Sequence, residues 1–241
     1  MADALNVHVF GADDAPPLLA LHGVTGHGAR FRRLAQWQLS AFRVIAPDLR
    51  GHGDSPRLPP WTLEQHTADV LAVMDTFGLQ RVSVMAHSFG ALIALRLPPD
   101  RVGALVLLDP AVSVKPREAL ESAEAAKREC SDPYAAQRQD WPTAEEDVIA
   151  EEVSDNWVTK YGVWSPKCSP AAVATAWSEM CRPVPLPRVR TLVVRALRAR
   201  YVGPEFLAAA RGVELVDLDC GHMVTVEEPD RVGGLVSGFV R

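Results

Sequence analysis

The sequence has few cysteines, and no two of them are spaced as a metal-binding or redox motif. Four cysteines are spread over 241 residues, without any Cys-x-x-Cys pair. Such scattered thiols do not indicate a disulfide framework or a zinc site. We therefore expect ordinary buried or half-buried thiols, and we predict neither a metal nor a cofactor. The four are Cys130, Cys168, Cys181 and Cys220.

Long apolar runs and clusters of positive charge are also lacking. No segment approaches the roughly 18 consecutive apolar residues of a membrane-spanning helix, and residues 1–5 have neither the charge nor the apolar stretch of a secretory signal. The formal net charge is -5, with no basic run, so the chain lacks an electrostatic footprint for nucleic acid. We expect a cytoplasmic monomer or small homo-oligomer with no nucleic-acid or membrane partner.

Short apolar runs alternate with segments of helical spacing along most of the chain. This alternation predicts an α/β fold, a mostly parallel doubly wound sheet with helices on both faces. In such a sheet, reactive groups collect at the carboxyl ends of the strands. The predicted strands are 5–10, 18–21, 42–46, 82–86, 104–108, 191–194 and 213–218, and the clearest helices are 29–39, 62–78, with a capping box from Thr62 to Gln65, and 230–240.

The pattern changes between residues 111 and 187. Charges, helical stretches and four of the six tryptophans replace the strand pattern there. We interpret 111–187 as a helical cap inserted into a core formed by 1–110 and 188–241. Trp141 and Trp164 are our candidates for substrate contact. The alternative is that the tryptophans form the small apolar core of the cap itself.

A serine stands where the fourth predicted strand passes into a helix. The strand Val82–Ala86 is followed by His87-Ser88 and then by alanine, leucine and isoleucine at helical spacing. A side chain on such a sharp turn is lifted off the end of the sheet, and the unpaired N–H groups of the next helix point toward whatever it attacks. Alternatively, Ser88 simply caps the helix.

The turn resembles the nucleophile elbow of the α/β-hydrolase fold, Gly-x-Ser-x-Gly, with Ala86 in place of the first glycine. Three further motifs match the family in its order: His22-Gly23 after an early strand, Asp48–Ser55 as Asp-x-x-Gly-x-Gly-x-Ser, and Gly221-His222 before the last helix. The chain thus resembles the cap-bearing serine esterase and lipase-like branch of that family.

The resemblance implies a serine hydrolase mechanism. Ser88 would be the nucleophile and His222 the base, since imidazole takes up and releases protons near neutral pH. The backbone N–H groups of Val24 and Phe89 would form the oxyanion hole. In the loop that contains Val24, His22 and Gly23 would belong to the substrate-binding site. His27 would lie at the mouth of the crevice, where it either touches substrate or is simply solvated.

The acid that orients His222 is less regular. The family usually places an aspartate shortly after the strand 191–194, but here no carboxylate occurs before Glu205. Some relatives place the acid at the end of the strand after the elbow helix, which corresponds to Asp109. We prefer Asp109, whose other interpretation is a turn residue before proline. Glu205, or a dyad without a carboxylate, is the alternative.

The predicted reaction is hydrolysis of a small carboxylic ester or thioester through an acyl-serine. Haloalkane dehalogenases and epoxide hydrolases use an aspartate nucleophile, whereas position 88 is serine. A carbon–carbon bond hydrolase or a cofactor-free peroxidase would use the same triad. A ligand-binding protein with an idle triad is the alternative outside enzymes.

Overall fold

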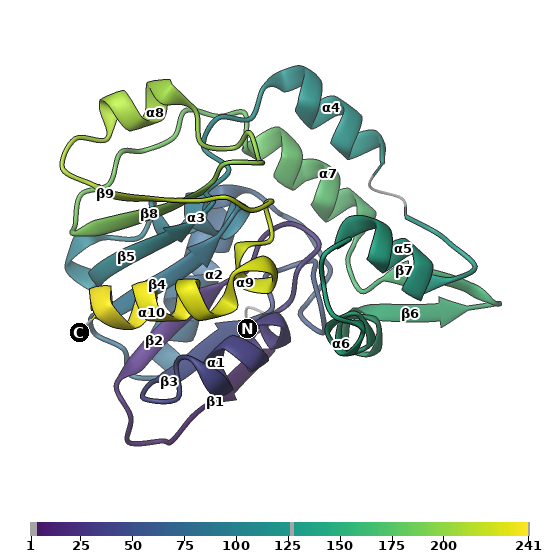
Figure 1. The fold of residues 1–241 in the computed structure, drawn as a ribbon, viewed down its shortest axis with the longest axis horizontal. Helices are drawn as coiled ribbons and strands as arrows, with labels where there is room; N and C mark the ends of the chain where they lie inside the picture. The colour runs from purple at the N-terminus through teal and green to yellow at the C-terminus, as the bar shows by residue number, and fades with distance from the viewer. Residues whose placement is uncertain (1–3, 126–127, 241) are drawn as a thin grey trace.

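The computed structural model describes residues 4–125 and 128–240, and a seven-stranded sheet runs through its centre (Figure 1). The strand order is β1-β3-β2-β4-β5-β8-β9; β1 is antiparallel to β3 and every other neighbouring pair is parallel. The predicted mostly parallel sheet is thus confirmed. The strands are β1 (Val7–Phe10), β2 (Pro17–Leu21), β3 (Arg43–Pro47), β4 (Val82–His87), β5 (Val102–Leu108), β8 (Thr191–Ala196) and β9 (Glu214–Leu218).

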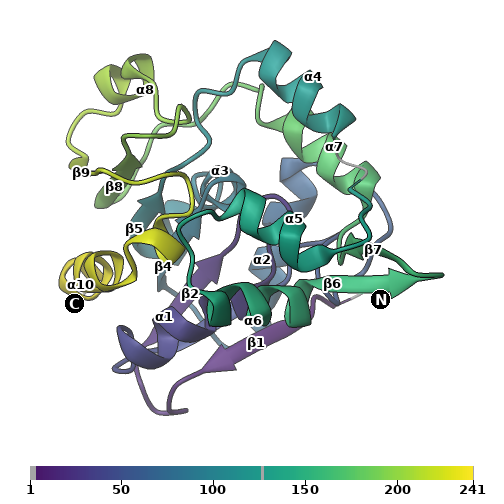
Figure 2. The same ribbon diagram turned by 45° about the vertical axis from the view of Figure 1, so that its right-hand side comes forward.

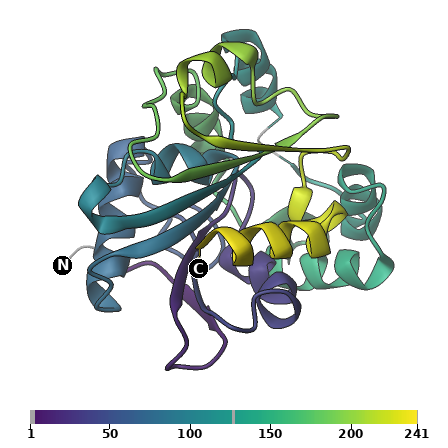
Figure 3. The ribbon, with the colours of Figure 1, turned by 60° about the vertical axis from the view of Figure 1, so that its left-hand side comes forward.

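Helices cover both faces of the sheet because apolar side chains occupy successive positions of its inner strands. Leu19 and Leu21 of β2 join an apolar cluster with α2, α3 and α8, whereas Leu18 and Ala20 join one with α1 and α10. Figure 3 shows α10, in yellow, along one side of the sheet. The helices of the core are η1 (Gly28–Phe31), α1 (Arg32–Trp37), α2 (Leu63–Thr76), α3 (Phe89–Ala94), η2 (Pro99–Arg101), α8 (Pro204–Ala209), α9 (Val224–Glu227) and α10 (Pro229–Val240).

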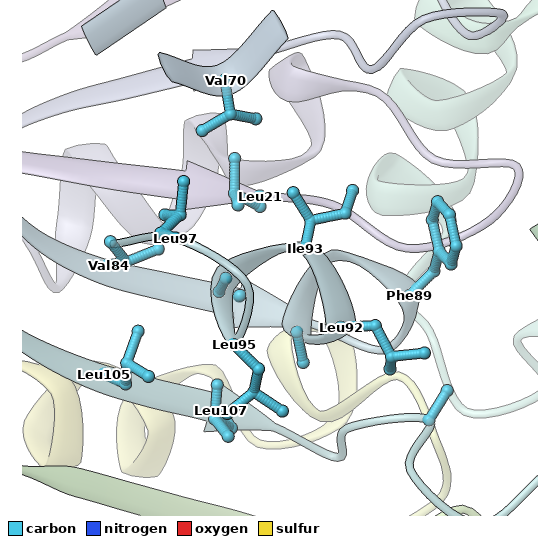
Figure 4. Packing of buried hydrophobic residues seen from close by; sticks show 14 of the residues in the cluster. Leu21, Val70, Val84, Phe89, Leu92, Ile93, Leu95, Leu97, Leu105 and Leu107 are labelled. Carbon is cyan, nitrogen blue, oxygen red and sulfur yellow. The ribbon is translucent and has the colours of Figure 1, made fainter. Parts of the chain in front are cut away.

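The short helix α3 is buried on every side. Phe89, Leu92 and Ile93 have no exposed surface, and in the view of Figure 4 Ile93 lies beside Leu21 of β2. Burying a leucine or phenylalanine side chain contributes roughly 1.5–3 kcal/mol. The turn that begins α3 is therefore fixed by packing on both sides of it.

Between β5 and β8 the chain forms an insert beside the sheet (Figures 1 and 2). Helix α4 packs on α7, and α5 packs on α6. Trp141, Ile149, Val153 and Trp157 form a small apolar core within it. Its elements are α4 (Pro116–Glu124), α5 (Pro133–Asp140), α6 (Glu146–Asn156), β6 (Trp157–Lys160), β7 (Val163–Pro166) and α7 (Pro170–Glu179). The exact division at 111 and 187 stays a prediction.

The structure differs from the predicted elements in three places. The insert contains a β-hairpin, β6–β7, whose two-residue turn Tyr161-Gly162 has positive φ at both positions, as type I′ turns require. The predicted helix 29–39 is a 3₁₀ turn followed by the short α1. At the start of α2, Thr62 accepts from the Gln65 N–H, but the Gln65 amide binds Asp69, so only half of the capping box forms.

Candidate active site

Ser88 lies on the turn between β4 and α3 with a strained backbone. Its φ is 53° and its ψ is -117°, a conformation that side-chain-bearing residues rarely adopt. The turn persists because the Ser88 N–H donates to Leu108 O at 3.1 Å and Ser88 O accepts from the N–H groups of Ala91 and Ala111. The side chain makes no capping hydrogen bond to α3. It is free to bond elsewhere, so the helix-cap interpretation does not hold.

His222 and Asp109 meet Ser88 beyond the carboxyl ends of the strands. His222 Nε2 lies 2.9 Å from Ser88 Oγ, and His222 Nδ1 lies 2.6 Å from Asp109 Oδ2. Asp109 is fully buried, and its Oδ1 accepts from the Ala196 N–H at 3.0 Å. A carboxylate at Nδ1 keeps the proton on that nitrogen, so the lone pair of Nε2 faces the serine hydroxyl. This geometry allows His222 to remove the Ser88 proton.

The alternative acid Glu205 and the two aspartates that precede His222 lie elsewhere. Glu205 begins α8 and lines a cavity that does not include Ser88 or His222. Asp217 and Asp219 form ion pairs with arginines of the neighbouring β8 strand and the loop after it. Among the described residues, Asp109 is the carboxylate that hydrogen-bonds His222.

The loop after β2 passes directly against the serine. A Cβ at Gly23 would lie 2.8 Å from Ser88 Cβ and 3.3 Å from Ser88 Oγ, so only glycine fits there. His22 holds this loop: its Nδ1–H donates to Gly23 O at 2.7 Å, and its Nε2 accepts from the Leu49 N–H at 2.8 Å. Burial lowers the pKa of His22, with the nearby His52 adding to the effect, so the ring stays neutral.

The two N–H groups predicted as oxyanion donors belong to the elements that flank Ser88. Phe89 is the first residue of α3, where an N–H has no helical carbonyl to bind. Val24 follows Gly23 and lines the same cavity as Ser88 and His222. No hydrogen bond engages either N–H within the part of the chain that the structure describes. Both remain available for a substrate oxygen.

Two rings pack against the His222 imidazole. The Tyr201 ring centroid lies 4.2 Å from that of His222, and the His87 centroid lies 4.6 Å away. His87 Nε2–H donates to His222 O at 2.9 Å, and burial, with the adjacent His222 adding to it, holds the pKa of His87 well below its usual value. Burial raises the pKa of Tyr201. Both residues stay neutral, and both rings restrict the movement of the imidazole.

A cavity of about 360 Å³ lies in front of Ser88, between the core and the insert. The core contributes Val24, Tyr201 and His222 to its wall as well as Ser88. Most of its lining side chains are polar. From the insert and the segment that leads into it come Arg128, Gln137, Trp141, Asn156, Trp157 and Trp177.

The predicted substrate-contact residues only partly reach this cavity. Trp141 lines it, but Trp164 lies on β7 and packs on the apolar core of the insert. The other tryptophans that line the cavity are Trp157 and Trp177. His27 does not line this cavity, and it is buried instead of solvated. Its Nε2 lies 3.1 Å from Glu152 Oε2, with which it forms a hydrogen bond.

A buried ion pair connects the insert to the core beside the cavity. Arg30 Nε donates to Glu152 Oε2 at 3.1 Å, and the Arg30 guanidinium lies 5.0 Å from the Trp141 ring centroid. Burial alone would raise the pKa of Glu152, but Arg30 and His27 together hold it below its usual range. Glu152 is therefore ionised. Asn156 donates to Glu152 and to the carbonyl oxygen of Thr25, which ties α6 to the loop beside Ser88.

Sequence reasoning missed several of these residues. Gln137 and Arg128 occupy a surface-like, charged stretch that carried no signal for a cavity. Tyr201 did carry a sequence signal, because it is an aromatic residue in the loop where a carboxylate was expected but is absent. Among residues 4–125 and 128–240, no group of three or more potential ligands could hold a metal ion. No described helix is long and apolar enough to cross a membrane.

Comparison with known proteins agrees with this geometry. A family profile described as the alpha/beta hydrolase fold matches residues 16–143. Lipase LipV of Mycobacterium tuberculosis is 37% identical over an alignment of 254 positions, which covers 96% of this chain and 96% of that protein.

Solved structures give the same fold at lower identity. E-2-(acetamidomethylene)succinate hydrolase superposes with a TM-score of 0.86 at 22% identity, covering 98% of this chain and 94% of that one. A marine microorganism esterase superposes with a TM-score of 0.79 at 20% identity, covering 99% and 100%. By its matched profile, its full-length relative and its architecture, this chain belongs to the alpha/beta hydrolase fold family.

Proposed function

We propose that the protein is a serine hydrolase that cleaves a carboxylic ester or thioester through an acyl-serine. Within the lipase- and esterase-like enzymes that this chain resembles over its whole length, the proposal assigns Ser88 as nucleophile, His222 as base and Asp109 as the orienting acid. The observation that carries it is the continuous hydrogen-bonded series Ser88 Oγ, His222 Nε2, His222 Nδ1 and Asp109 Oδ2.

The proposed reaction proceeds in two halves. His222 Nε2 takes the proton of Ser88 as Oγ attacks the ester carbonyl, and the N–H groups of Val24 and Phe89 receive the developing oxyanion. The bond to the leaving group breaks, and His222 returns the proton to the departing alcohol or thiol. Water then attacks the acyl-serine with His222 again as base, which releases the acid and restores the Ser88 hydroxyl.

The buried state of Asp109 supports its role. A fully buried carboxylate is unfavourable unless it is paired, and here one oxygen faces His222 and the other an N–H group. When His222 becomes positively charged during proton transfer, Asp109 lies 2.6 Å from Nδ1 and stabilises that charge. The proton transfer therefore becomes easier at the moment of attack.

Labelling with a fluorophosphonate probe tests the proposal. The probe should attach to Ser88, and Ser88→Ala should abolish labelling and lower turnover of a short p-nitrophenyl ester by at least about 10³-fold. Ser178→Ala, a change at an exposed serine of α7, is the matched control and should leave both unchanged. A wild type that binds small esters yet neither labels nor hydrolyses them would instead be a ligand-binding protein.

A further inference from the structure

The wall of the cavity that the insert provides carries polar groups beside its three tryptophans. Gln137 and Asp140 of α5 line it, together with Arg128 from the preceding segment. An alkyl chain placed against these groups would remove them from water without offering hydrogen bonds, which costs free energy for each group. These polar groups disfavour a plain acyl chain at the part of the wall that they form.

Gln137 is held so that one end of its amide faces the cavity. Its side chain belongs to a buried residue, 4% exposed, and its Oε1 accepts from the indole N–H of Trp157 at 3.2 Å. Trp157 is fixed in turn, since the Arg128 guanidinium lies 5.4 Å from its ring centroid. Because Oε1 is engaged, Nε2 is the amide atom left for the cavity. No acceptor for Nε2 exists among the described residues.

The charged groups around the same cavity are already paired. Arg30 pairs with Glu152, and Arg128 pairs with Asp140. The two positive and two negative groups of the lining thus balance. Among the side-chain amides of the lining, the Nε2 donor of Gln137 and the Oδ1 acceptor of Asn156 have no partner within the described residues. The donor of Gln137 is neutral, and its natural complement is an uncharged acceptor oxygen.

We infer that Gln137 determines substrate specificity, and that the substrate is a short ester or thioester with a second, uncharged carbonyl oxygen away from the scissile bond. This inference rests on the proposed serine hydrolase function. The Gln137 amide N–H donates to that second oxygen and orients the substrate over Ser88. A cavity of about 360 Å³ is near the small end of ligand pockets, which fits a short substrate.

Matched pairs of esters test the inference on the wild type. On the acyl side, p-nitrophenyl levulinate is compared with the ester in which a methylene group replaces the ketone oxygen. On the alcohol side, the acetate of acetopropyl alcohol is compared with its methylene analogue by pH-stat titration, and every pair is repeated one carbon longer. We expect kcat/KM to be about three- to tenfold higher for the ketone in at least one series.

Substitution of Gln137 should remove this preference. Gln137→Met keeps the length of the side chain without a donor, and Gln137→Glu keeps an acceptor for Trp157. Both should bring the ketone-to-methylene ratio of kcat/KM close to one. Gln139→Met, an exposed position two residues along α5, is the control and should keep the wild-type ratio. A purely structural role for Gln137 would lower both rates together and leave the ratio unchanged.

Three results would overturn the inference. The first is equal kcat/KM for ketone and methylene esters in every wild-type series, and the second is a ketone-to-methylene ratio of kcat/KM that survives in both Gln137 variants. The third is faster hydrolysis of p-nitrophenyl monosuccinate than of the levulinate, which would assign substrate recognition to the arginines. If one variant fails to fold, the wild-type ratio and the other variant still decide. Failure of the serine hydrolase proposal looks different, because Ser88 would then resist the fluorophosphonate and no ester would be cleaved.

Discussion

The catalytic edge of the core and the insert that faces it are held by different forces. In the core, Ser88 and Asp109 follow adjacent strands that are buried on both faces, and apolar packing sets their positions. The insert contacts α1 and the turn before it largely through charge, by pairs such as Arg30 with Glu152 and Arg33 with Glu151. Apolar packing is short-ranged and insensitive to salt, whereas exposed ion pairs weaken as salt rises. The more exposed contacts of the insert, such as Arg33 with Glu151, should therefore weaken with salt, whereas the packing that positions Ser88 and Asp109 should not.

Removing the orienting acid should produce the largest effect in this comparison. Asp109→Asn keeps the shape of the side chain but loses the charge that stabilises protonated His222, so kcat should fall by about 10⁴-fold. Steady-state hydrolysis of a p-nitrophenyl ester measures this. Glu205→Gln, at the start of α8, should stay within a few-fold of wild type. The reverse pattern would show that the acid was assigned to the wrong residue.

Closing the narrow space beside the serine should have the next largest effect. In Gly23→Ala, the new methyl group lies 2.8 Å from Ser88 Cβ, so the loop or the serine must move. A misplacement of about 1 Å costs on the order of 10² in rate, and we expect that loss in kcat with a small change in Tm. Gly234→Ala on α10 meets nothing within 4 Å and should not change kcat. Full activity of Gly23→Ala would place the nucleophile farther from this loop.

Breaking the buried ion pair should loosen the insert. Glu152→Gln leaves the Arg30 guanidinium, whose side chain is 11% exposed, without a full counter-charge. Removing one partner of a buried pair costs about 3 kcal/mol, which urea denaturation would measure as a lower free energy of unfolding. Glu151→Gln removes the neighbouring pair to Arg33, where the glutamate is 43% exposed, and should cost less than about 1 kcal/mol. Equal losses in the two variants would contradict the contrast between buried and exposed contacts.

The same contrast separates what the sequence predicts well from what it does not. The strands and the elbow at Ser88 are local patterns of apolar spacing and turn chemistry, and the structure contains them where expected. The meeting of Asp109 with His222 depends on the sheet order, and it was predicted through resemblance to a family.

The cavity wall is harder to predict. Gln137 is positioned there by a hydrogen bond from Trp157, the first residue of the hairpin, and neither helical periodicity nor composition indicates such a contact. The cavity is lined by Trp157 and Trp177 and not by Trp164, and the sequence could not distinguish them for the same reason, since all three are tryptophans in one charged stretch. Which of them meets a cavity is decided by tertiary packing.

Acid should reveal a smaller effect that belongs to the core alone. Burial lowers the pKa of His66 to about 3, and His66 Nδ1 has no hydrogen-bond partner. In the unfolded chain the same ring titrates near pH 6.5, so below that pH the unfolded state binds more protons. The stability contributed by the neutral ring is complete above about pH 6.5 and is lost as the pH falls toward the folded pKa. By pH 5 the loss is about 2 kcal/mol.

Thermal melts of wild type and His66→Leu between pH 8 and pH 5 measure this contribution. The Tm of the wild type should fall more steeply than that of the variant, because leucine takes up no proton in either state. At pH 8 the His66 ring is neutral in both the folded and the unfolded state. The difference in Tm between wild type and variant at that pH therefore reports only the change in packing against Phe89, and it serves as the internal control. Parallel curves over the whole range would mean that the buried ring of His66 does not contribute to acid sensitivity.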